Sequence, residues 1–97
     1  MGGQSALVTG SSRGIGLGAA VELARAGFAV AVNGPAEDAE LAGAVETVRG
    51  EGGAVVATAF DVADVRAHAA ALERIEAEIG PLTTLVNNAG VGVMSRG

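Results

Sequence analysis

Four short apolar segments alternate with three longer segments of helical periodicity along this chain of 97 residues. The apolar segments cover residues 5–8, 28–32, 54–60 and 84–86, and they lack the polar–apolar alternation of strands that face water. This order of strands and helices predicts one α/β domain over residues 1–97, with a parallel sheet, right-handed crossovers and helices on both faces.

Glycine, proline and acidic residues mark the expected helix ends. The first helix is predicted over residues 14–26, and the second is predicted to open at Pro35, directly after a turn at residues 33–35. The third is predicted to start after Asp64 as N-cap and to stop at Gly80. Apolar side chains at helical spacing predict the buried faces of the second and third helices: Leu41, Val45 and Val48, then Val65, Leu72, Ile75 and Ile79.

The composition excludes several classes of function. Without cysteine and with a single histidine, the chain has no disulfide framework, thiolate metal site or multi-histidine metal site. Its formal net charge of −5 argues against a nucleic-acid surface. The sequence has no signal-peptide pattern and no apolar stretch long enough for a membrane span, so we expect a cytoplasmic protein with no membrane partner.

The segment TGSSRGIG, Thr9 to Gly16, connects the first strand to the first helix. In a parallel sheet this loop lies beyond the carboxyl ends of the strands, where ligands bind. Gly10 would permit a tight turn, Gly14 would let backbone approach a pyrophosphate, and Gly16 would let the helix pack close to the strand. A purely structural turn is the alternative, but a strand before the loop and a helix after it favour phosphate binding.

Two further motifs accompany the loop: Asp61-Val62 after the third strand and Asn87-Asn88-Ala89-Gly90 after the fourth. Together the three motifs resemble the short-chain dehydrogenase/reductase family, and within it the 3-oxoacyl-(acyl-carrier-protein) reductases. The resemblance covers essentially the whole chain but only the first half of the family's fold. It implies a Rossmann-type doubly wound sheet with strand order 3-2-1-4, in which residues 10–16, with Ser12 and Ile15, hold the phosphates of a dinucleotide.

The same resemblance implies roles for the two later motifs. Asp61 would accept a hydrogen bond from the adenine amino group, beside the backbone of Val62. Asn88, Ala89 and Gly90 would lie against the adenosine ribose and the route to the nicotinamide.

Arg13 and Asn33 bear on the choice between NADP and NAD. NAD-binding Rossmann domains place an acid at the end of the second strand, where it binds the ribose hydroxyls. Asn33 stands at about that position in the cofactor site, so no carboxylate opposes a 2′-phosphate there. An arginine just before the second loop glycine resembles the family's NADP-binding pattern, and a guanidinium can donate two hydrogen bonds to a phosphate. The sequence therefore favours NADP, with NAD as a further possibility and an Arg13 that points into solvent as the alternative.

The family's chemistry uses a serine and a Tyr-x-x-x-Lys pair, and this chain has neither tyrosine nor lysine. We assign no catalytic residue here, expect these groups beyond Gly97, and expect the chain alone to be inactive. Three interpretations stay open: the cofactor-binding half of an oxidoreductase for a small carbonyl or alcohol, homo-oligomeric when complete; a non-catalytic nucleotide-binding module; or a truncated product. The first is favoured because every motif serves a cofactor. In each case the fourth strand is expected to have an exposed edge.

Overall fold

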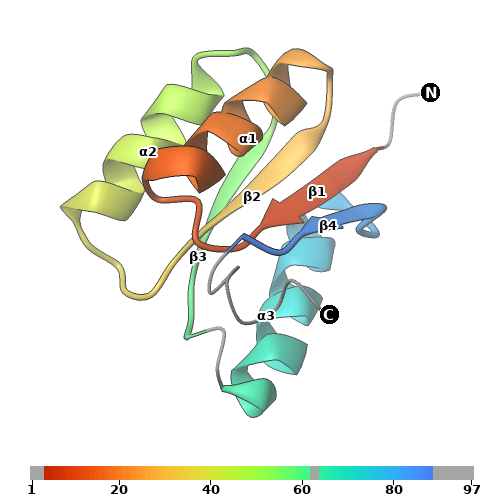
Figure 1. The fold of residues 1–97 in the computed structure, drawn as a ribbon. Helices are drawn as coiled ribbons and strands as arrows, with labels where there is room; N and C mark the ends of the chain where they lie inside the picture. The colour runs from red at the N-terminus through yellow and green to blue at the C-terminus, as the bar shows by residue number, and fades with distance from the viewer. Residues whose placement is uncertain (1–3, 62–63, 89–97) are drawn as a thin grey trace.

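A computed structural model describes residues 4–61 and 64–88 of the chain. The elements alternate as predicted: β1 (Ser5–Val8), α1 (Gly14–Arg25), β2 (Ala29–Gly34), α2 (Ala39–Arg49), β3 (Val55–Ala59), α3 (Val65–Ile79) and β4 (Thr84–Val86). The strands form a parallel sheet in the order β3-β2-β1-β4, which confirms the predicted strand order. Figure 1 shows α1 and α2 together on one face of this sheet and α3 on the other.

The face under α1 and α2 carries the larger apolar core. Val8, Val30 and Val32 of the two central strands are buried there. Against them α1 contributes small side chains and α2 contributes branched ones, among them Ala20, Ala24, Leu41 and Val48. Alanines let a helix lie close to a sheet, since little side-chain volume separates the two backbones.

A smaller core lies under α3, where Leu7 and Ala31 pack against Ile75. The predicted N-cap of α3 is confirmed, because the Asp64 carboxylate accepts hydrogen bonds from the backbone N–H groups of residues 66 and 67 at 3.1 and 3.4 Å. The predicted buried face is wrong at Leu72, which is exposed. The helix packs along the row of Ala71 and Ile75, spaced by four residues, and this row turns Leu72 away from the sheet.

Two predicted boundaries around α2 are wrong. β2 continues through Asn33 and Gly34, which pair with residues 58 and 59 of β3, so these residues are strand and not turn. α2 begins at Ala39 and not at Pro35, because the Asp38 carboxylate accepts a hydrogen bond from the Leu41 N–H at 2.9 Å and caps the helix there.

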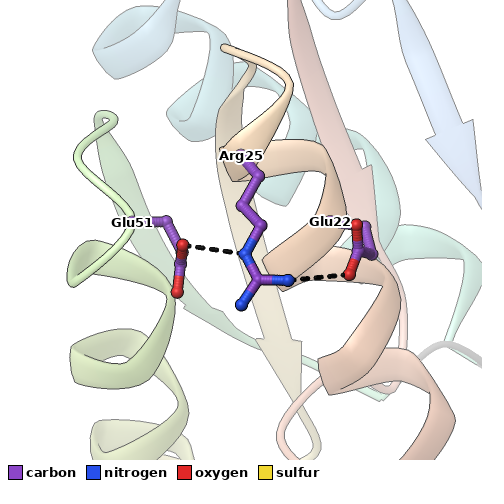
Figure 2. Close-up of polar contacts among 3 residues, drawn as sticks. All are labelled: Glu22, Arg25 and Glu51. Atoms are coloured by element: carbon purple, nitrogen blue, oxygen red, sulfur yellow. Dashed lines mark hydrogen bonds and ion pairs between the residues drawn. The ribbon is translucent and has the colours of Figure 1, made fainter.

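Arg25 connects the end of α1 to the loop that precedes β3 (Figure 2). Its guanidinium donates to Glu22 within the helix and to Glu51 beyond α2, both at 3.0 Å. The hydrogen bond and the charge of Glu51 raise the pKa of Arg25, with a smaller contribution from Glu22. The group is exposed, so we expect salt to weaken this connection.

β4 is an edge strand of the sheet, as predicted. Its Leu85 pairs with Leu7 of β1, yet the Leu85 residue is 63% exposed. An apolar residue left uncovered on an edge strand is a place where further chain or a partner can pack. Across residues 4–61 and 64–88, no helix has both the length and the apolar content needed to cross a membrane.

Candidate cofactor site

The candidate site lies at the carboxyl end of β1, between the ends of β2 and β4. The chain leaves β1 after Val8 and turns through residues 9–13 into α1. The Thr9 N–H donates to the Val86 carbonyl of β4 at 2.9 Å, and the Ser11 N–H donates to the Asn33 carbonyl of β2 at 2.8 Å. β1 has β2 on one side and β4 on the other, which makes this end the crevice where doubly wound sheets bind ligands.

The loop glycines have the backbone that only glycine adopts easily. Gly10 and Gly14 have φ values of 61° and 63°, in the left-handed region. Gly16 is constrained by space: a Cβ there would lie 2.4 Å from the Gly10 carbonyl oxygen and 2.7 Å from Nδ2 of Asn88. This close approach joins the first turn of α1 to the loop, whereas the prediction for Gly16 was close packing of the helix against the strand.

Buried polar groups beneath the loop fix its path. Oγ of Ser11 donates to the Val8 carbonyl at 2.6 Å and accepts from the Asn33 N–H at 2.8 Å. Oδ1 of Asn33 accepts from the Gly10 N–H at 2.8 Å, while its Nδ2 lies 3.3 Å from the carbonyl of Thr58. The amide of Asn33 is thus buried among backbone groups of the loop and of β3. The structure shows that Asn33 holds the loop, a role that the sequence analysis did not assign to it.

Two asparagines fasten the end of β4 to the same loop. Oδ1 of Asn87 accepts from the Thr9 hydroxyl at 3.2 Å. Asn88 donates twice: its backbone N–H to Oγ1 of Thr9 at 2.9 Å, and its Nδ2 to the Gly10 carbonyl at 3.2 Å. Asn88 therefore belongs to the frame of the loop, and the ribose contact expected of it stays a prediction.

The outer side of the loop is open. Arg13 is the N-cap residue of α1, and its side chain makes no capping hydrogen bond. The first turn of α1 contains no acidic residue, so nothing there neutralises the positive end of the helix dipole. Ile15 in that turn is 84% exposed, and a Cβ on Gly14 would have no atom within 4 Å. The first-turn N–H groups of such a helix are suited to an anion, with an apolar side chain beside it.

Glu40, in the first turn of α2, is a site residue that sequence reasoning missed. Its Oε2 lies 3.7 Å from Nη1 of Arg13, and its Oε1 accepts a hydrogen bond from Oγ of Ser12 at 3.4 Å. The side chains of Arg13 and Glu40 are 81% and 44% exposed, so water surrounds the pair. Arg13 is therefore exposed but does not simply point into solvent, because the Glu40 carboxylate lies beside its guanidinium.

Of the remaining predicted residues, one lies just beyond the edge strand β3 and the others fall outside the described residues. Asp61 is exposed just beyond β3, and its carbonyl accepts from the Asp64 N–H at 2.8 Å. Val62, Ala89 and Gly90 fall outside the described residues. Within the part of the chain that the structure describes, no three metal-ligating side chains come together.

Comparison with known proteins extends over nearly the whole chain. Residues 4–96 match the family described as short chain dehydrogenase. The chain is 44% identical over 90 residues to 5-keto-D-gluconate 5-reductase of Escherichia coli K12, covering 92% of this chain and 35% of that protein. It is 40% identical over 88 residues to a 3-oxoacyl-(acyl-carrier-protein) reductase of Staphylococcus aureus Mu50, covering 91% and 36%.

A solved structure matches the fold at similar identity. The crystal structure of 3-oxoacyl-(acyl-carrier protein) reductase from Brucella melitensis in complex with NAD superposes with a TM-score of 0.82 and 40% identity. The match covers 90% of this chain and 33% of that one. The chain spans about a third of the length of the curated relatives it matches.

Proposed function

The chain belongs to the short-chain dehydrogenase family, and we propose that it is the cofactor-binding part of an NADP(H)-dependent oxidoreductase. The reaction would move a hydride between the cofactor and the carbon of a small carbonyl compound or alcohol. A keto-sugar acid and a 3-oxoacyl thioester are the two substrate classes that the names of the relatives suggest. We further propose a cytoplasmic homo-oligomer for the complete protein.

The observation that carries this proposal is the open loop at the end of β1. Gly14 is exposed and its backbone has no side chain in front of it, so a pyrophosphate can reach the N–H groups of the first turn of α1. Ile15 would cover the apolar faces of the ligand next to those groups. The hydrogen bonds of Asn33 and Asn88 to Gly10 would keep the loop in this shape whether or not the cofactor is bound.

The nicotinamide cofactor supplies or accepts the hydride when bound; the residues described here bind and orient it. A proton must also move to or from the substrate oxygen, and the chain has no tyrosine or lysine to do this in the family's manner. We propose that those groups belong to sequence beyond Gly97.

Arg13 is proposed to select NADP(H) over NAD(H). Its guanidinium is exposed at the N-cap of α1 and free of any capping hydrogen bond, so it can turn to a 2′-phosphate near the loop. A charge-assisted hydrogen bond contributes about 1.5–3 kcal/mol, which corresponds to about tenfold to a hundredfold in affinity.

Calorimetric titration of the chain with NADPH and with NADH tests both parts of the proposal. We expect Arg13→Ala to weaken NADPH at least about tenfold more than NADH. Arg49→Ala is the matched control, because Arg49 is also an exposed arginine paired with a glutamate, but lies at the end of α2. Equal losses for the two cofactors would refute the role of Arg13, and no binding of either cofactor would refute the proposed function.

A further inference from the structure

We infer that Glu40 is a specificity-determining residue of the cofactor site: it opposes a 2′-phosphate and so limits the preference for NADP(H) that Arg13 is proposed to give. This inference deepens the proposed function and rests on it. Glu40 follows the N-cap Asp38 in the first turn of α2, a helix that starts at the same edge of the sheet as the glycine loop. It lies 27 positions along the chain from Arg13, and the fold brings the two together.

A single carboxylate contacts the two loop side chains that are candidates for phosphate binding. Its Oε1 accepts from Oγ of Ser12 at 3.4 Å, and its Oε2 lies 3.7 Å from the guanidinium of Arg13. A phosphate that binds Arg13 must take the guanidinium from Glu40 or share it. Either way, the entering group comes within reach of a carboxylate of the same charge sign.

The Glu40 carboxylate disfavours binding of a 2′-phosphate far more than binding of a ribose hydroxyl. A phosphate monoester carries about −1.5 to −2 charges near neutral pH, whereas a hydroxyl carries none. Like charges repel even at an exposed site, although water and salt reduce the effect. The hydroxyl can instead donate a hydrogen bond to the carboxylate, an interaction that the phosphate oxygens cannot provide.

The packing around Gly34 brings the first turn of α2, which carries Glu40, against the end of β2. A Cβ on Gly34, the last residue of β2, would lie 3.4 Å from Cβ and Oγ of Ser12 and 3.5 Å from Cδ1 of Leu41. The end of β2, the glycine loop and the first turn of α2 are therefore packed together. Asn33 carries no charge and is buried, so Glu40 is the acid that this arrangement presents beside Arg13.

The test compares the affinities of the chain for NADPH and NADH by calorimetry before and after Glu40→Gln. The glutamine keeps the length and the hydrogen-bonding oxygen of Glu40 but removes the charge. We expect the preference for NADPH over NADH to rise about threefold to tenfold, with NADH itself changed less than about twofold. Glu40→Lys, which reverses the charge, should move the preference further in the same direction.

Glu46→Gln is the matched control, because it removes the same charge from the same helix about two turns away, where Glu46 pairs with Arg49. It should leave the preference unchanged, and circular dichroism checks that each variant is folded. A preference that stays constant within twofold in both Glu40 variants overturns the inference while the proposed function stands. No binding of either cofactor to the unaltered chain overturns the proposed function, and this inference with it.

Discussion

Replacing Gly16 by alanine tests whether the glycine loop is held as tightly as its packing indicates. The added Cβ would lie 2.4 Å from the Gly10 carbonyl oxygen, 3.0 Å from the Gly10 carbonyl carbon and 2.7 Å from Nδ2 of Asn88. Two of these three atoms are backbone, so the neighbours cannot move aside by rotating a side chain. To relieve these contacts, the first turn of α1 must move away from the loop, and the Asn88 side chain must also shift from its hydrogen bond to Gly10.

The size of the effect follows from two opposing contributions. Overpacking costs about 1–3 kcal/mol, and contacts this short with backbone belong at the upper end of that range. Alanine in a helix recovers about 0.5–1 kcal/mol relative to glycine. We therefore expect Gly16→Ala to lower the free energy of unfolding by about 2 kcal/mol, and the melting temperature by about 10 °C for a chain of this size.

Gly18→Ala supplies the matched control two residues further along α1. A Cβ at Gly18 has no atom within 4 Å, so the substitution keeps the helix gain without the clash. We expect it to raise the free energy of unfolding by about 0.5–1 kcal/mol. Thermal and urea unfolding of both variants, followed by circular dichroism, shows whether each substitution raises or lowers the free energy of unfolding. A Gly16→Ala variant that is stabilised to the same extent as Gly18→Ala would refute the packing described for the loop.

Three further substitutions test the frame of the fold. Asn33→Ala removes the acceptor of the Gly10 N–H and leaves buried backbone groups without partners, so urea unfolding should show a loss of about 2–3 kcal/mol; a loss under about 0.5 kcal/mol would contradict the buried network. Asp38→Ala removes the cap of the Leu41 N–H and should cost about 1 kcal/mol, with Asp38→Asn recovering most of it. Arg25→Gln should lower the melting temperature slightly in dilute buffer and not at all in about 1 M salt, where the screening length is about 3 Å. A lower melting temperature that persists in high salt would show that Arg25 acts through packing and not through its charge.

The order of the elements was predictable because each strand and helix carries its own signal in neighbouring residues. Apolar runs, glycines after helices and the N-cap Asp64 are all local, and the structure places the elements accordingly. The end of β2 was not predictable in this way. Asn33 and Gly34 have the composition of a turn, and their pairing with β3, more than twenty residues away, makes them strand.

The candidate site shows the same division between local and distant information. The glycine spacing predicted the tight turn at Gly10, since positive φ values depend on residue type. The ion pair of Arg13 with Glu40 depends on where α2 starts, and the sequence analysis placed that start at Pro35 and not after Asp38. An error of four residues at this helix end was enough to hide the carboxylate that faces the loop.

The site separates residues that hold the loop from residues that face outward, and this separation has a consequence for binding. Ser11 and Asn33 are buried and bonded to backbone, and Asn88 reaches the loop from the end of β4. Arg13 and Ile15 point away from this frame and contribute little to the core. A loop that is ordered before the ligand arrives loses little entropy on binding, so affinity can come from a few outward contacts. Changes to the buried set should therefore act on affinity through stability, whereas changes to the outward set should alter affinity at nearly constant stability.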